Sequence, residues 1–333
     1  MPPRSYYLEP QKTDYLAFAK AYLSDEYGIA KAFIDEKGLP YIRNADHLAA
    51  YLGVSPSLVR QILHKKEYHY RQFPLPKADG PPRLISTPKT YLKTIQWWIG
   101  DNILSHVALG DEVHGFRQGH SYVTNARVHL GCNHILNMDI EQFFPSITKP
   151  MTTSVFTSLG YGKEGAGVLA ELCTLDGSTP TGAPTSPAIG NMVLVDFDRA
   201  MTKLAGENTL KYTRYADDLT FSSNEWISPE FALQVEEVLK GYGFAPKGTK
   251  TKFMGRSDRM EITGVTINEG TNPPREWRNW ARGFLHRARM NPHQYAHEWK
   301  KIAGIYGTLK SMDPDEDKLL TKRAKQVLNL VRS

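Results

Sequence analysis

The chain has 333 residues, of which 41% are hydrophobic and 23% are charged, and its formal net charge is +6 at pH 7. This length gives room for two or three structural units, and the two cysteines, Cys132 and Cys173, lack metal-ligand spacing, which indicates reduced thiols. The start of the chain has no apolar signal-peptide segment and no run is long enough to span a bilayer, so we expect a soluble, cytoplasmic protein without membrane contact.

The first 66 residues are predicted to be helical. Residues 44–60 have the pattern of two short helices, in which Gly53 makes the turn, Ser55 caps the second helix and Pro56 begins it. The same pattern occurs in helix–turn–helix DNA readers. We favour a helical cap packed on the rest of the chain, because paired short helices with a glycine turn are widespread.

Residues 68–76 and 83–89 are predicted to form two strands joined by a turn at 78–82. Arg83 on the second strand could reach a triphosphate or be an ordinary surface charge. Further on, Asn125 and His129 are four residues apart, so on a helix they share a face. This face could either pack inside the protein or contact RNA, and the sequence does not favour one of these roles.

Three carboxylates are predicted to come together from two places in the chain. Residues 133–140 are typical of a buried strand that ends in Asp139, where a carboxylate is costly unless it is paired or bound to a metal. Asp217 and Asp218 stand at the turn between two runs rich in Tyr, Thr and Phe. Such a pair also occurs as a plain polar turn. The third carboxylate favours a site for two divalent cations about 3.5–4 Å apart, the arrangement of phosphoryl displacement.

A tight loop at 181–187 lies between these carboxylates in the sequence, and a helix is predicted after it, at 188–204. Gly182 and Ala183 leave the backbone of this loop bare, so a flat base or sugar can approach it. After the hairpin we expect a helix at 229–242, a basic strand at 247–252 that carries Lys250, and a strand at 261–268.

The positive charge is concentrated at the end of the chain. Residues 272–333 hold 13 Lys and Arg against 6 Asp and Glu, whereas the rest of the chain has a net charge of −1. Tryptophans and tyrosines are interleaved with these basic residues. A solvated helical face is one interpretation, but the mixture favours nucleic acid, which offers phosphates to the charges and bases to the rings.

Three motifs occur in one order: DIEQFFPS at 139–146, GAPTSP at 182–187 and YADD at 215–218. Together they resemble the reverse transcriptase family, over roughly residues 68–268. The sequences NARVH at 125–129 and ITG at 262–264 are similar to motifs of the retron branch. Two positions depart from the family pattern: Thr181 stands where Gln is usual, and Lys247 replaces a frequent Asn.

The resemblance implies an α+β protein with the right-hand polymerase fold. It implies a helical N-terminal segment at 1–66, fingers at 67–131, a palm at 132–271 with a small antiparallel sheet and an insertion at about 150–180, and a basic helical thumb at 272–333.

The resemblance also implies an RNA-directed DNA polymerase, a nucleotidyltransferase that uses two Mg²⁺ ions, with Mn²⁺ as an alternative. The catalytic residues would be Asp139, Asp217 and Asp218, and the metal ligands these three and Ile140. The implied nucleotide-binding residues are Arg83, Phe143, Phe144, Gly182, Ala183 and Lys250. The implied RNA- or template-binding residues are Asn125, His129, Thr263, Gly264, Arg282, Arg287 and Arg289.

The implied partners of a retron enzyme are deoxynucleoside triphosphates, a structured non-coding RNA and its DNA product. Synthesis would begin at an internal 2′-OH and give a branched RNA–DNA product, msDNA, in phage defence with an effector protein. One alternative is a small reverse transcriptase of the group II intron-like or diversity-generating type. A non-enzymatic alternative is a nucleic-acid-binding structural factor with an inert polymerase fold, which the intact set of three aspartates disfavours.

Overall fold

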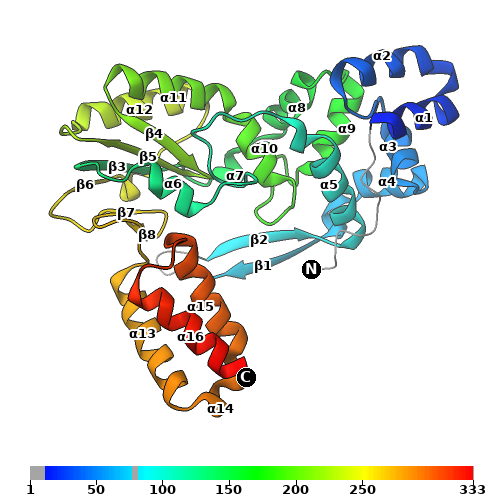
Figure 1. Cartoon of the computed structure of the whole chain (residues 1–333). Helices are drawn as coiled ribbons and strands as arrows, with labels where there is room; N and C mark the ends of the chain where they lie inside the picture. Colours follow the sequence, from blue (N-terminus) through cyan, green and yellow to red (C-terminus); the bar gives the residue numbers. More distant parts are fainter. Residues whose placement is uncertain (1–11, 77–81, 333) are drawn as a thin grey trace. The chain divides into compact units, whose positions relative to one another are not determined.

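The computed structural model describes residues 12–76 and 82–332, and Figure 1 shows its helices and strands. The chain divides into two compact units. Unit 1 comprises residues 1–110, 141–197 and 242–244, and unit 2 comprises residues 111–140, 198–241 and 245–333. Because the chain passes between the units several times, neither is one continuous stretch, and each is described by itself below.

Unit 1 begins with a set of short helices whose ends follow local signals in the sequence. The Asn44 side chain accepts the N–H groups of Asp46 and His47, and the Ser55 side chain accepts the N–H group of Leu58. Gly53 ends one helix in the left-handed conformation, with φ of 64°. The predicted turn and cap are therefore confirmed. The helices are α1 (Lys12–Tyr22), α2 (Tyr27–Lys37), α3 (Ala45–Leu52) and α4 (Pro56–His64).

The rest of unit 1 combines a two-stranded antiparallel sheet with helices. The predicted strand pair is confirmed, and the turn predicted at 78–82 lies outside the described residues except for Pro82. The helix predicted at 188–204 is broken at Leu194 into two helices, of which the second continues into unit 2. The elements are β1 (Tyr70–Leu75), β2 (Arg83–Pro88), α5 (Thr90–Asn102), α7 (Phe143–Ser146), α8 (Lys149–Ser158), α9 (Lys163–Cys173), α10 (Ser186–Val193) and α11 (Val195–Glu207).

Unit 2 is built on a four-stranded antiparallel sheet with the strand order β4-β5-β3-β6. Both the strand predicted at 133–140 and the hairpin around Asp217 and Asp218 are confirmed. The strands are β3 (His134–Asp139), β4 (Lys211–Tyr215), β5 (Asp218–Ser223) and β6 (Lys252–Gly255), and the helices beside them in the sequence are α6 (Tyr122–Val128) and α12 (Pro229–Gly241).

Two predicted strands of unit 2 are different in the structure. The strand predicted at 261–268 is a hairpin of β7 (Glu261–Ile262) and β8 (Val265–Thr266), because Thr263 and Gly264 adopt φ of 46° and 80° and reverse the chain. Of the basic strand predicted at 247–252, residues Gly248–Lys250 form a 3₁₀ turn and only Lys252 begins β6.

The C-terminal helix group closes unit 2 and consists of α13 (Arg275–Met290), α14 (Pro292–Tyr295), α15 (Trp299–Met312) and α16 (Leu319–Arg332). Its own apolar core is formed by residues such as Phe284, Leu285, Ile302 and Val327, which are at most 4% exposed. Among the described residues, no helix is both long and apolar enough to cross a membrane.

Candidate active site

Three carboxylates meet at one end of the sheet of unit 2. Tyr215 pairs with Asp218 at the end of the β4–β5 hairpin, so Ala216 and Asp217 form its tip. Antiparallel pairing of β3 with β5 places Asp139 directly opposite Asp218. In addition, the N–H group of Ile140 donates a hydrogen bond of 2.9 Å to the carbonyl of Asp217. The predicted convergence of the three aspartates is therefore built by strand register.

Asp139 and Asp218 line a cavity of about 400 Å³ together with the segment Thr249–Lys252. The Lys250 ammonium group contacts the Asp139 carboxylate, which is 5% exposed. The N–H group of Lys247 donates a hydrogen bond of 2.7 Å to the Asp139 carbonyl, which holds the start of the 3₁₀ turn beside the strand. The resemblance implied a nucleotide-binding role for Lys250, and the structure places its ammonium group at Asp139.

The electrostatics of this cavity are dominated by negative charge. The pKa of Asp218 is raised to about 7, first by burial and then by the charges of Asp217 and Asp139, against the opposing effect of Lys250. Burial lowers the pKa of Lys250, but the hydrogen bond and the charge of Asp139 outweigh that effect, so its pKa is raised overall. The cluster therefore holds more negative charge than one ammonium group compensates.

The side chains fit a hard divalent cation by donor type, since carboxylate oxygens are the preferred ligands of Mg²⁺. Their present arrangement differs from a metal site: in the described part of the chain, no group of three or more His, Cys, Asp and Glu residues is placed to hold an ion. The Lys250 ammonium group stands at the Asp139 carboxylate. Ion binding would therefore require this ammonium group to move away from Asp139.

A buried ion pair supports the hairpin tip, and the sequence interpretation missed it. Arg214 donates to both carboxylate oxygens of Asp198, with distances of 2.8 and 2.6 Å, and these two side chains are 0% and 1% exposed. The Arg214 guanidinium also donates to the carbonyl of Ala216 at 3.1 Å. Ala216 itself has φ of 58°, a conformation that costs free energy in residues other than glycine. The sequence offered a weak signal, an arginine between the aromatic residues Tyr212 and Tyr215 of a predicted strand.

A loop before α6 clamps the same hairpin. The N–H group of Arg214 donates to the carbonyl of Glu112, and the N–H group of His114 donates to the carbonyl of Arg214, both at 2.8 Å. A Cβ atom on Gly115 would lie 2.4 Å from the backbone nitrogen of Ala216, a distance too short for any side chain. Gly115 therefore permits the close approach of the loop to the acidic tip.

The predicted RNA contact of Asn125 and His129 disagrees with their burial, because both side chains are 0% exposed. His129 hydrogen-bonds the hydroxyl groups of Ser222 and Thr213, at 2.6 and 2.7 Å, and so joins β5 to β4. The pKa of His129 is lowered to about 3, first by burial and then by the charge of Lys211, so the ring is neutral. Packing, the other interpretation of this face, agrees with the structure.

The other predicted RNA-binding residues lie elsewhere in unit 2. The Thr263 hydroxyl donates to the carbonyl of Tyr122 at 3.2 Å, and Gly264 shares its turn. The side chains of Arg282, Arg287 and Arg289 are exposed on α13. An indole ring on the same helix, that of Trp280, is 45% exposed.

The predicted nucleotide-binding residues other than Lys250 belong to unit 1. Gly182 has φ of 115°, and a Cβ atom there would lie 2.9 Å from the Ile85 side chain on β2. The bare backbone of Gly182 packs closely against β2 and Ala183 is 5% exposed, but Gly182 itself is exposed, so the approach of a base to this loop stays a prediction. Arg83 is exposed on β2. The rings of Phe143 and Phe144 lie 5.1 Å apart, and Phe143 is buried against Gly190.

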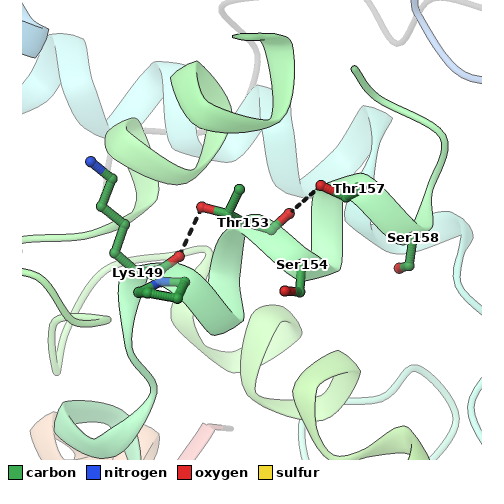
Figure 2. A pocket seen from close by; sticks show the side chains of 6 residues that line it. Lys149, Thr153, Ser154, Thr157 and Ser158 are labelled. Carbon is green, nitrogen blue, oxygen red and sulfur yellow. Dashed lines mark hydrogen bonds between the residues drawn. The ribbon is translucent and has the colours of Figure 1, made fainter. Parts of the chain in front are cut away.

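Figure 2 shows another hollow of unit 1, of about 630 Å³, along one face of α8. The hydroxyl groups of Thr153 and Thr157 donate to the carbonyls of Lys149 and Thr153, at 2.9 and 3.0 Å. Both hydroxyl groups are used in hydrogen bonds within α8. This hollow is larger than the cavity at Asp139 and Asp218, but fewer polar side chains point into it together.

Comparisons with known proteins agree with the geometry. The family described as reverse transcriptase (RNA-dependent DNA polymerase) matches residues 75–267. The chain is 33% identical to the Retron Mx65 reverse transcriptase of Myxococcus xanthus over 314 residues, covering 86% of this chain and 73% of that protein. It is 32% identical to the Retron Ec86 reverse transcriptase of Escherichia coli over 236 residues, covering 70% of this chain and 73% of that protein.

The chain belongs to the reverse transcriptase family, whose activity is RNA-directed DNA polymerisation. Within that class it is a retron-type reverse transcriptase. The family implies a right-hand polymerase fold, and the helices and small antiparallel sheets agree with it. Reverse transcriptases generally use divalent metal ions, usually Mg²⁺.

Proposed function

We propose that Asp139, Asp217 and Asp218 form the site of DNA synthesis. The observation that carries this proposal is the strand register, which sets Asp139 opposite Asp218 beside Asp217. When bound there, two Mg²⁺ ions would supply Lewis-acid stabilisation of the phosphates and a lower pKa of the primer hydroxyl. The carboxylates supply the oxygen ligands, and the backbone bond between Ile140 and Asp217 holds the two strands at that end.

Lys250 and residues of unit 1 have supporting roles in this proposal. Without a cation, the Lys250 ammonium group pairs with the buried Asp139 carboxylate. With a cation held by the carboxylates, this ammonium group would leave Asp139 and could pair with a triphosphate oxygen. Arg83, exposed on β2, would also pair with phosphate oxygens. The finger, palm and thumb subdivisions expected from the sequence are part of the same proposal.

Primer extension tests the carboxylate roles. Asp217→Asn keeps the size of the side chain but removes its charge, so we expect extension to fall below a few per cent of the parent rate. Asp176→Asn is a matched control on an exposed residue of unit 1. Thermal unfolding with and without Mg²⁺ gives a second reading, in which the parent and the control are stabilised and Asp217→Asn is not. Retained synthesis by Asp217→Asn would refute the assignment.

We propose that the Phe144 ring excludes ribonucleotides, by analogy with the position of this aromatic residue in the family motif. The ring lies beside the buried Phe143, which holds it in place. Phe144→Ala is expected to raise incorporation of ribonucleotides relative to deoxynucleotides, measured by competition in primer extension. An unchanged ratio would remove the role of sugar selection from this residue.

We propose that the template is a structured non-coding RNA of the same retron. Synthesis would begin at an internal 2′-OH of that RNA and give a branched RNA–DNA product. The support is the similarity to retron enzymes over most of the chain, together with the exposed arginines and Trp280 on α13. A role in phage defence with an effector protein follows from the same resemblance and belongs to this proposal.

A further inference from the structure

A small cavity of unit 2 gathers positive charge outside the site of the three aspartates. It has a volume of about 240 Å³ and lies between the start of α13, the end of α15 and the segment Asp313–Thr321. Arg278, Arg282 and Lys318 line it. Burial has the largest effect on the pKa of Lys318 and lowers it, the charge of Asp313 raises it, and the charges of Arg278 and of Arg127, on α6, lower it.

The cations of this cavity form no close ion pairs among the described residues. In the described ranges 12–76 and 82–332, Arg127, Arg278, Arg282 and Lys318 form no ion pair within 4 Å. Neighbouring lysines behave differently, since Lys310 and Lys325 both pair with Glu316. The cations of this cavity therefore differ from these two lysines, which are paired with a carboxylate.

The one acidic residue that lines the cavity, Asp313, is already occupied. Its two carboxylate oxygens accept the N–H groups of Asp317 and Lys318, at 3.2 and 3.0 Å. The Lys318 ammonium group donates to the carbonyl of Thr271 and the side chain of Asn272, at 2.6 and 2.9 Å. Both hydrogen bonds of Lys318 are to neutral oxygens, and the single charge of Asp313, which raises the pKa of Lys318, offsets only part of the positive charge of Arg278, Arg282 and Lys318.

Donor groups on α13 remain available to a ligand. The Nε atom of Arg278 is buried and has no hydrogen-bond partner among the described residues. Arg282 donates from one guanidinium nitrogen to the Asn279 side chain, at 3.1 Å, which leaves further N–H groups. A buried N–H group without a partner is costly, and the cost is removed when an acceptor binds.

We propose that this cavity binds a phosphate group, and that the phosphate belongs to the backbone of a bound nucleic-acid strand. Guanidinium and ammonium groups are the side chains that bind phosphate best. Pockets for whole small molecules occupy about 300–1,000 Å³, so the smaller volume here favours a phosphate over a complete nucleotide. The exposed Trp280 on the same helix offers a surface on which a base of that strand could stack.

The identity of the polymer rests on the proposed function, whereas binding of phosphate does not. The test therefore has two arms. Inorganic phosphate is titrated into the full chain and followed by ³¹P NMR. A short single-stranded RNA is titrated at several salt concentrations and followed by fluorescence anisotropy. The test variant is Arg278→Gln with Arg282→Gln, and thermal unfolding checks that it is folded.

The matched control is Arg60→Gln with Lys203→Gln, which removes two charges from exposed side chains on α4 and α11. We expect the test variant to lose phosphate binding and to bind RNA about tenfold more weakly, with a salt slope smaller by about 0.7 for each lost contact. The control is expected to change little in either arm. Arg278→Lys with Arg282→Lys should restore most of the affinity, because the charge is kept.

Loss of phosphate binding with unchanged RNA affinity would overturn the nucleic-acid strand as the ligand and leave a free phosphate compound. A test variant that matches the control in both arms would overturn the site itself. If the double variant is unfolded, the single variant Arg282→Gln is used in both arms instead. Because the Arg282 side chain is exposed, its replacement should leave the protein folded. Primer extension by the parent protein separates the two proposals. If the parent shows no extension, the proposed function is refuted, whereas the phosphate titration still tests whether the cavity binds phosphate.

Discussion

At the scale of single residues, His129 shows how burial fixes a protonation state. Its ring is completely buried and accepts or donates hydrogen bonds with two hydroxyls, and it carries no charge in the folded protein. These partners are 84 and 93 residues away in the sequence. Nothing local in the motif at 125–129 distinguishes such a ring from one that contacts RNA.

The buried ring predicts acid sensitivity. Unfolding raises the pKa of His129 from about 3 to its ordinary value of 6.5, so the unfolded chain binds more protons between these values. The stabilisation is fully present above pH 6.5 and is lost as the pH falls, by about 2 kcal/mol at pH 5.

Urea unfolding of the parent and of His129→Gln at pH 7.5 and pH 5 measures this effect. The parent should lose about 2 kcal/mol more than the variant on acidification, since Gln does not titrate. Equal losses would mean that His129 is not the neutral group that the structure indicates.

At the scale of elements, the β4–β5 hairpin carries the candidate site, and two features hold its tip. One is the Arg214–Asp198 pair with its hydrogen bond to Ala216, and the other is the loop at Gly115. Removing one partner of a buried ion pair costs about 3–5 kcal/mol, so the tip is held by an interaction that is costly to disrupt. Reacting groups must be held to within a fraction of an ångström.

Gly115→Ala tests the role of the loop. The new Cβ atom would lie 2.4 Å from the nitrogen of Ala216, so the loop or the tip must move. We expect kcat for primer extension to fall by about ten- to a hundredfold, with a smaller change in KM for the nucleotide. Gly206→Ala is the control, because no atom lies within 4 Å of its Cβ position. Equal activity of both variants would contradict the positioning role.

The elements also show how far the sequence determines the fold. The tip at 216–217 and the cap at Ser55 follow from residues within a few positions, and both were predicted. The Lys250 turn and the partner of Arg214 depend on contacts with other segments, since Lys247 bonds to Asp139 and Arg214 to Asp198. The sequence predicted that Asp139 and Asp218 lie close together. Only the structure shows that antiparallel pairing of β3 with β5 places them opposite each other.

At the scale of the whole molecule, charge is separated within unit 2. The sheet end carries three aspartates countered by Lys250, whereas residues 272–333 have 13 basic and 6 acidic residues. A polyanionic strand is therefore attracted to the C-terminal helix group, and divalent cations to the sheet end. Both attractions suit a protein that copies RNA into DNA.

Sequencing the nucleic acid that co-purifies with the protein tests the central claim most directly, with the parent and Asp217→Asn prepared in parallel. The account predicts one RNA species joined through a 2′-linkage to a short DNA in the parent, and the same RNA without DNA in Asp217→Asn. Random cellular RNA in the parent, or joined DNA in Asp217→Asn, would contradict it.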